Sequence, residues 1–287
     1  MHVCMTESRT VLCMQDDGCH AVPYANKLII FGDSWSDNGQ LNSGIANEQR
    51  QSNGWTWVEY LSMMTGADLY DYAFSGATAN NSVVNRSTYD VGQQIGLFLG
   101  NESQIGQSES ERSVFMIWTG VNDVHDIFTT INETEQQLET INQVVLSIEN
   151  ELRVLHQVAS AKQLAILGLA PIDRLALFAD SLEDERQQLR WLVRQYNAKL
   201  RSLARRFSAQ TGTRTVFVDI HSLFDSIFLA PVIFGFAEIN DTCISQAFLC
   251  EEYPNRYLWW DGWHPTTATH RLIAITVLGQ LAIFDIN

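Results

Sequence analysis

Short, largely apolar runs alternate along this chain with longer segments in which apolar residues recur at helical spacing. The clearest runs are KLIIF at 27–31 and VFMIWT at 114–119, and QLAILGL at 163–169 is similar. Runs of this length without polar alternation are typical of strands that are buried on both faces of a sheet. The pattern predicts five strands, at 27–31, 69–74, 114–119, 163–169 and 215–220.

The segments between these runs carry apolar residues at steps of three and four. In 134–161 this stripe consists of Leu138, Ile141, Val145, Ile148, Leu152, Leu155 and Val158. Such spacing places apolar side chains on one face of an amphipathic helix. Further helices are predicted at 55–64, 184–208 and 266–286.

Alternating strands and helices predict the α/β class, as a three-layer α/β/α sandwich around a five-stranded parallel sheet. We expect a single domain at 26–287, preceded by an N-terminal arm at 1–25 that is disordered or foreign to the native protein. Ligands of such sheets bind beyond the carboxyl ends of the strands. The residues that directly follow each strand are therefore the first candidates for chemistry.

The composition limits the partners of this chain. Of its 287 residues, 46% are hydrophobic, which is enough for a full core, and the formal net charge is −15. A strongly acidic protein repels phosphate backbones, so nucleic acid is not an expected partner. No run of 18 apolar residues occurs, so no membrane span is expected. The oligomeric state cannot be read from the sequence.

The cysteines and the glycosylation sequons bear on location. Cys243 and Cys250 lie close together in TCISQAFLC, and we predict a disulfide there, with two free thiols as the alternative. Disulfides persist in oxidising compartments. The residues at 1–25 lack the apolar core of a signal peptide. The predicted location is nevertheless extracellular, because five sequons begin at Asn80, Asn85, Asn101, Asn132 and Asn240.

Polar residues follow the first three strands. Ser34 comes after the first strand in FGDSWSDNG, where the amino end of a helix would favour developing negative charge. Gly76 follows the second strand, and a glycine there lets a backbone N–H approach a ligand. Asn122 follows the third strand and offers a neutral side-chain donor. Taken singly, an N-cap, a turn glycine and a polar turn are the alternatives.

The segment DGWHP near the C-terminus holds Asp261 and His264, three residues apart. A turn can bring the two side chains together, so that the aspartate fixes the imidazole tautomer while the other ring nitrogen takes a proton from a serine. The alternative is a capping aspartate beside an incidental histidine.

The order of these four segments resembles the four blocks of the GDSL or SGNH hydrolase family. The blocks are FGDSWSDNG, YAFSGAT, GVND and DGWHP, and the resemblance covers roughly Lys27 to the C-terminus. It implies the flavodoxin-like SGNH hydrolase fold. Trp35 departs from the family pattern, because it stands where leucine is common, and we expect it to alter the pocket wall.

The resemblance implies acyl transfer through a covalent acyl-enzyme. Ser34 would be the nucleophile, His264 the general base and Asp261 the residue that orients it. The N–H groups of Ser34 and Gly76 and the Asn122 side chain would form the oxyanion hole, and neither a metal nor an organic cofactor is expected.

Two aspartates have supporting roles in this scheme. Asp33 is interpreted as holding the nucleophile turn, and Asp123 as organising the loop around Asn122.

Aromatic residues surround the predicted site. Trp35, His125, Trp260 and Trp263 are candidates to line the substrate cleft and to stack on sugar rings, with plain packing as the alternative. The apolar segment SIFLAPVIFGF at 226–236 is predicted to pack in the core rather than to face lipid.

The spacing of the blocks and their tryptophans resemble those of fungal secreted acetylesterases of carbohydrate esterase family sixteen. This predicts an esterase that removes acetyl groups from a small-molecule or oligosaccharide ester. A lipase, phospholipase or lipid acyltransferase of the thermolabile-haemolysin type is the alternative. A non-catalytic glycan-binding protein on the same scaffold is a third hypothesis.

Overall fold

The computed structural model describes residues 2–6, 9–14, 18–21, 26–40, 50–100 and 107–283. The sequon at Asn101 and the end of the predicted C-terminal helix, 284–286, lie outside these residues.

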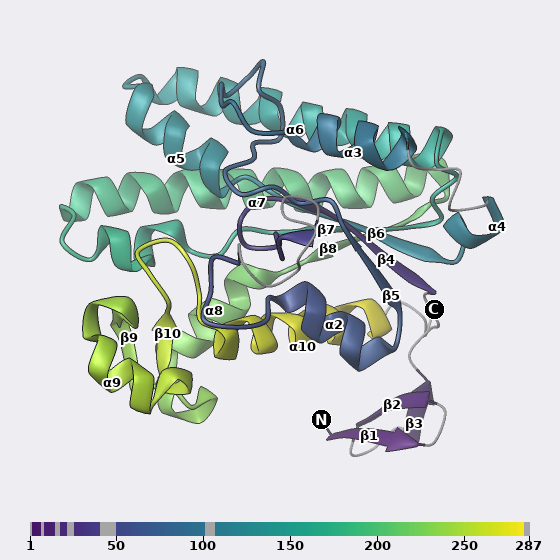
Figure 1. Cartoon of the computed structure of the whole chain (residues 1–287). Helices are drawn as coiled ribbons and strands as arrows, with labels where there is room; N and C mark the ends of the chain where they lie inside the picture. The colour runs from purple at the N-terminus through teal and green to yellow at the C-terminus, as the bar shows by residue number, and fades with distance from the viewer. Residues whose placement is uncertain are drawn as a thin grey trace.

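A five-stranded parallel sheet forms the centre of the molecule, as Figure 1 shows. Its strand order is β5-β4-β6-β7-β8, and every neighbouring pair is parallel. The strands are β4 (Lys27–Gly32), β5 (Asp68–Asp71), β6 (Ser113–Trp118), β7 (Gln163–Leu167) and β8 (Arg214–Val218). All five predicted strands are confirmed. Every residue of β4 and β6 is buried, which explains their continuous apolar runs.

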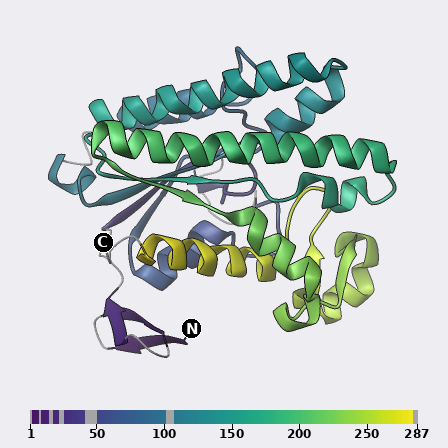
Figure 2. The same cartoon turned by 180° about the vertical axis from the view of Figure 1, so that it is seen from behind.

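Helices cover both faces of this sheet, which confirms the three-layer sandwich (Figures 1 and 2). One face carries α3 (Val91–Gly100), α5 (Val121–Thr130), α6 (Thr134–Gln157) and α7 (Glu183–Thr211). The other face carries α2 (Trp57–Thr65), α8 (Ile220–Leu229) and α10 (Thr267–Ile283). A one-turn helix, α4 (Gln107–Ser110), precedes β6.

The long helices follow the predicted stripes, but several shorter helices, α3 and α5 among them, were not predicted. In α6 the buried side chains include Ile141, Ile148 and Leu152, as the stripe predicts, but the helix ends at Gln157 and Val158 is exposed. Neither α3 nor α5 was expected, and Asn122 was interpreted as part of a loop. It lies instead in the first turn of α5, after Gly120 with φ of 118°. A Cβ at Gly120 would collide with the Tyr196 ring, so this helix start requires glycine.

Two further groups of strands lie outside the central sheet. Near the N-terminus, β1 (His2–Thr6), β2 (Arg9–Met14) and β3 (Gly18–Ala21) form an antiparallel sheet. Near the C-terminus, β9 (Glu238–Thr242) and β10 (Tyr257–Trp259) form a parallel pair. The division of the chain into an arm and a catalytic domain stays a prediction.

Between β9 and β10 the chain forms α9 (Ala247–Glu252). The structure joins Cys243 to Cys250 in a disulfide, with their Cα atoms 5.1 Å apart. This bond ties α9 to the residue that directly follows β9, so it stiffens a small region that has little core of its own.

The predicted core packing of the apolar segment 226–236 is wrong for three of its residues. Ile227 and Phe236 are buried, but Leu229, Val232 and Ile233 are 86%, 81% and 82% exposed. The cause is geometric, because only one face of α8 packs inward and the 3₁₀ turn at Pro231–Phe234 buries no residue. Phe248 on α9 adds a fourth exposed apolar side chain. No helix among the described residues is long and apolar enough to cross a bilayer.

Candidate active site

The carboxyl ends of three neighbouring strands bring the predicted polar residues to one edge of the sheet. Ser34 follows β4, Gly76 follows β5, and Asn122 follows β6 at the start of α5. The chain leaves β4 toward β5 on one side and reaches β6 on the other, so the strand order reverses at β4. A crevice opens at such a reversal, and ligands of parallel sheets bind there.

A tight turn holds Ser34 directly after β4. The carbonyl oxygen of Asp33 accepts hydrogen bonds from the N–H groups of Ser36 and Asp37, both at 3.0 Å. Asp33 Oδ1 accepts a further bond from the Trp35 N–H at 3.0 Å. Asp33 thus ties together the turn that contains Ser34, through both its backbone and its side chain.

The turn after β10 brings Asp261 and His264 together. The Trp260 N–H donates to the His264 carbonyl at 2.8 Å and closes the turn. Asp261 Oδ1 accepts from the backbone N–H groups of Trp263 and His264, at 2.7 and 2.8 Å. His264 Nδ1 lies 2.9 Å from both carboxylate oxygens of Asp261, and His264 Nε2 lies 2.8 Å from Ser34 Oγ. Serine, histidine and aspartate therefore form one continuous hydrogen-bonded chain.

The charge state of Asp261 fits this arrangement. Burial raises the pKa of its carboxyl group, but hydrogen bonds from His264 and two backbone N–H groups outweigh that effect and lower the pKa. An ionised Asp261 accepts the Nδ1 proton of His264, which leaves Nε2 free to accept the Ser34 proton.

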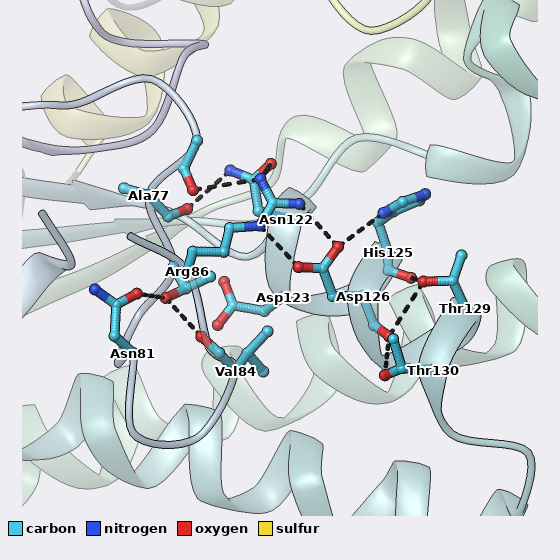
Figure 3. A network of polar contacts seen from close by, with 12 residues as sticks. Ala77, Asn81, Val84, Arg86, Asn122, Asp123, His125, Asp126, Thr129 and Thr130 are labelled. Atoms are coloured by element: carbon cyan, nitrogen blue, oxygen red, sulfur yellow. Dashed lines mark hydrogen bonds and ion pairs between the residues drawn. The ribbon is translucent and has the colours of Figure 1, made fainter. Parts of the chain in front are cut away.

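Asn122 is held by a hydrogen bond at each end of its carboxamide. Asn122 Nδ2 donates to the Ala77 carbonyl at 2.8 Å, and Asn122 Oδ1 accepts from Arg86 Nη1 at 2.9 Å, as Figure 3 shows. Ser34, Gly76, Asn122 and His264 all line one cleft of about 350 Å³. Its other lining residues are Trp35, Gln51, Ser75, Arg86, Val121 and Trp263.

Behind the cleft lie two buried carboxyl groups, Asp33 and Asp123. Asp123 accepts hydrogen bonds from the Ala79 N–H at 3.1 and 3.3 Å, and so ties the start of α5 to the loop after Gly76. Burial raises the pKa of each carboxyl group to about 7, against 3.8 for an ordinary aspartate.

We expect these two carboxyl groups to make folding stability fall as the pH rises from about 4 to about 7. In that window the folded state retains protons that the unfolded chain has released, so raising the pH favours unfolding. From pH 5 to a pKa of about 7, each group contributes roughly 2–3 kcal/mol to this fall. Urea unfolding measures this change. Between pH 5 and pH 8, the free energy of unfolding should fall less for Asp33→Asn and for Asp123→Asn than for the wild type.

Asp219→Asn is the matched control for this experiment. Burial raises the pKa of Asp219, but the hydrogen bond from Arg201 outweighs it and lowers the pKa. That carboxylate is ionised above pH 5 in the folded and in the unfolded protein, so this variant should lose as much unfolding free energy between pH 5 and pH 8 as the wild type. If Asp33→Asn and Asp123→Asn both lost as much as the wild type, the raised pKa of the two carboxyl groups would be contradicted.

The four predicted substrate-lining residues separate into two groups. Trp35 and Trp263 line the cleft, whereas His125 and Trp260 are absent from its lining among the described residues. His125 lies behind Trp263, with ring centroids 4.7 Å apart. Trp260 packs beside the Cys243–Cys250 disulfide. In the described part of the chain, no group of three or more His, Cys, Asp or Glu side chains gathers as a metal site.

Three residues that line the cleft, Gln51, Ser75 and Arg86, were not predicted. Ser75 is fixed by Asp37, whose Oδ2 accepts from the Ser75 N–H and hydroxyl at 2.8 and 2.9 Å. Arg86 is the middle residue of the sequon that begins at Asn85. Its contacts join segments that are 36 and 40 residues apart, so no local pattern could reveal them.

Comparison with known proteins agrees with this arrangement. The profile of the GDSL-like lipase/acylhydrolase family matches residues 28–277. Thermolabile hemolysin from Vibrio parahaemolyticus is 25% identical over 88% of this chain and 63% of its own length. Acetylesterase from Hypocrea jecorina is 30% identical over 34% of this chain and 35% of its own length. The chain therefore spans less than two thirds of the length of these curated relatives.

Solved structures show the same fold. A GDSL-like lipase structure from Parabacteroides merdae has a TM-score of 0.54 and 17% identity, covering 91% of this chain and 97% of the other. A catalytic mutant of an acetylxylan esterase from Geobacillus stearothermophilus has a TM-score of 0.51 and 15% identity, covering 91% and 95%.

The fold, a five-stranded parallel sheet between two layers of helices, is that of the SGNH class of α/β/α hydrolases. Because the family profile matches most of the described residues, the chain belongs to the GDSL-like lipase/acylhydrolase family.

Proposed function

We propose that this protein is an extracellular serine esterase that hydrolyses short acyl esters, above all acetyl esters of carbohydrates. The observation that supports the reaction class best is the position of His264, 2.8 Å from Ser34 Oγ and 2.9 Å from the Asp261 carboxylate. A serine hydroxyl is a weak nucleophile until an adjacent base removes its proton, and this geometry supplies that base.

The first half of the reaction acylates Ser34. His264 Nε2 takes the hydroxyl proton as Ser34 Oγ attacks the ester carbonyl carbon, and Asp261 stabilises the imidazolium that forms. The N–H groups of Ser34 and Gly76, together with Asn122 Nδ2, donate to the carbonyl oxygen as it becomes negative. The tetrahedral intermediate then collapses, and the departing alcohol takes its proton from His264.

The second half releases the acid. Water attacks the acyl carbon while His264 takes a proton from it, and the same donors stabilise the new oxyanion. Ser34 leaves as an alkoxide that receives the proton from His264, so the enzyme returns to its starting state. These steps use side chains and backbone groups of this chain, the ester substrate and water.

Trp35 supports a short acyl group. Together with Val121, it lines both the cleft and a small cavity behind it of about 10 Å³. That volume holds about one water-sized sphere, so an acyl group that extends into it must be small. The Trp35 ring is held by Trp118 and Trp259, with ring centroids 5.2 and 6.4 Å away.

The proposal of a carbohydrate substrate is supported by an aromatic side chain in the cleft and by partial similarity to an acetylesterase. Trp263 lines the cleft and offers an aromatic ring of the type that stacks on sugars. The partial similarity to the Hypocrea jecorina acetylesterase points the same way, as does the resemblance to carbohydrate esterase family sixteen.

We expect 4-nitrophenyl acetate to be hydrolysed with a kcat/KM at least about tenfold higher than 4-nitrophenyl octanoate. The reason is steric, since one misplaced methylene in a closed apolar pocket already costs about tenfold or more. Trp35→Leu enlarges the cavity and should narrow or reverse this preference. Circular dichroism should accompany that variant, because removal of a buried indole destabilises the core.

A preference for octanoate in the wild type would overturn the short-acyl proposal and favour a lipase or phospholipase. Two observations support that second candidate. Leu229, Val232, Ile233 and Phe248 expose apolar side chains, and the similarity to thermolabile hemolysin extends over most of this chain. Absence of turnover on every ester, with retained glycan binding, would instead favour a non-catalytic glycan-binding protein.

The extracellular location is supported by the disulfide between Cys243 and Cys250. Of the sequon asparagines, Asn85, Asn132 and Asn240 are exposed, as glycosylation requires. Mass spectrometry of the native protein recovered from the culture medium tests this inference. If the native protein were found solely inside the cell, with free thiols at Cys243 and Cys250, this inference would be contradicted.

A further inference from the structure

Arg86 occupies an unusual place in the cleft. It lies in the irregular segment between β5 and α3, and its side chain is 27% exposed. The guanidinium group faces Asn122 rather than open solvent, as Figure 3 shows. Arg86 takes part in none of the proposed acylation or deacylation steps.

One guanidinium nitrogen of Arg86 touches both sides of the proposed oxyanion hole. Arg86 Nη1 donates to Asn122 Oδ1 at 2.9 Å and to the Gly76 carbonyl at 3.4 Å. Asn122 and Gly76 are the two proposed oxyanion donors that lie outside the nucleophile turn. A single side chain therefore connects the loop after β5 to the first turn of α5.

The contacts with Arg86 and with the Ala77 carbonyl together decide how the Asn122 carboxamide is turned. Arginine has only donors, so the carboxamide must present its oxygen to Arg86. Asn122 Nδ2 then donates one hydrogen to the Ala77 carbonyl at 2.8 Å and retains a second hydrogen for the cleft. If the amide were flipped, its oxygen would replace the donor, and the oxyanion would meet a repulsive acceptor.

The guanidinium group is itself held rigidly. Arg86 Nε and Nη2 donate to the two carboxylate oxygens of Asp126, at 2.7 and 2.8 Å, in a bidentate ion pair. Asp126 lies four residues after Asn122 on α5, so the same helix presents the amide and the group that fixes its partner. Asp126 also offsets the positive charge of Arg86, which disfavours a role in binding anionic substrates.

We propose that Arg86 is a positioning residue that locks Asn122 in the orientation that donates to the oxyanion. This inference rests on the proposed esterase function and deepens it, because it explains how the neutral donor is oriented before substrate arrives. Since the lock acts on a group that bonds most strongly in the transition state, its loss should reduce kcat and leave KM nearly unchanged.

The test is steady-state hydrolysis of 4-nitrophenyl acetate by Arg86→Gln, Arg86→Lys, Asn122→Ala and the double variant Arg86→Gln/Asn122→Ala. We expect Arg86→Gln to lower kcat by about 10- to 100-fold, with KM within about twofold, because removal of one oxyanion donor costs about 100- to 1000-fold. Lysine keeps a charged N–H donor on a long side chain, whereas glutamine is neutral and shorter, so Arg86→Lys should recover part of the loss. In the double variant the Arg86 substitution should add little to the effect of Asn122→Ala.

Arg190→Gln is the matched control. Arg190 also forms an ion pair with an aspartate, the buried Asp173, and its side chain is 34% exposed, but it lies outside the cleft lining. Its replacement should leave kcat unchanged. Full kcat in Arg86→Gln, or additive losses in the double variant, would overturn the positioning role of Arg86. The proposed esterase function would survive that result if the wild type showed Ser34-dependent turnover. Absence of Ser34-dependent turnover in the wild type would instead overturn the proposed function.

Discussion

Ser34→Ala should reduce turnover of 4-nitrophenyl acetate by at least about 10⁴-fold while the protein remains folded. The variant retains the cleft and the oxyanion donors but has no oxygen to form an acyl-enzyme. Among the described residues, Ser34 Oγ has its hydrogen bond to His264 Nε2, and the turn itself is held by bonds to Asp33, so removal of the hydroxyl should leave the turn intact. Because the two residues act as a unit, Ser34→Ala/His264→Ala should be scarcely less active than Ser34→Ala alone.

Covalent labelling gives an independent measure of the same role. A fluorophosphonate should label the wild type at Ser34, as found by peptide mapping, and should not label Ser34→Ala. Ser226→Ala removes an exposed hydroxyl on α8 and serves as the control with full turnover and labelling. Near-normal turnover in Ser34→Ala, or a label on another serine, would contradict the assignment.

Asp261→Asn should have the second largest effect, a loss of about 10⁴-fold in kcat. An asparagine oxygen can still accept the two backbone hydrogen bonds from Trp263 and His264, so the turn should persist. Its amide nitrogen, however, donates toward Nδ1 and places the imidazole proton on Nε2, where it cannot accept from Ser34. Steady-state kinetics with 4-nitrophenyl acetate measure this loss, and circular dichroism shows whether the fold is kept.

Asp241→Asn provides a control with the same chemical change on the exposed surface of β9. It should leave kcat and KM unaltered. A loss of less than about tenfold in Asp261→Asn would mean that the His264 tautomer is fixed by some other group.

The candidate site illustrates how far local sequence determines geometry. Asp33, Ser34 and Trp35 are neighbours in the chain, and the turn that presents Ser34 is held by hydrogen bonds among them. Asp261 and His264 are likewise three residues apart and meet within one turn. Short-range motifs of this kind could be predicted because the residues that form each contact are adjacent in the sequence.

Contacts between distant segments could not be predicted in the same way. The bond from Arg86 to Asn122 joins an irregular loop to a helix start, 36 residues apart, and nothing near Arg86 indicates it. The separation of Trp263 from Trp260 also depends on the fold. One ring faces the cleft while the other packs beside a disulfide, although both flank the same motif.

The apolar segment at 226–236 was misjudged for a related reason. Its composition suits a buried element, and burial is the usual outcome for so many apolar residues. Whether a side chain is buried depends on whether it lies on the side of its helix or turn that faces the core. Leu229, Val232 and Ile233 lie on the outer side and are exposed.

The sequence by itself determined the layers of this protein, because strands buried on both faces must be apolar throughout and amphipathic helices must show their stripe. It also determined the identities of the residues that meet at the edge of the sheet, since parallel strands end on one side. Only the tertiary structure decided the shape of the cleft, the group that turns the Asn122 amide, and the apolar surface left exposed. These features arise where segments distant in the chain come into contact, and the strength of such contacts depends on distances that no local pattern encodes.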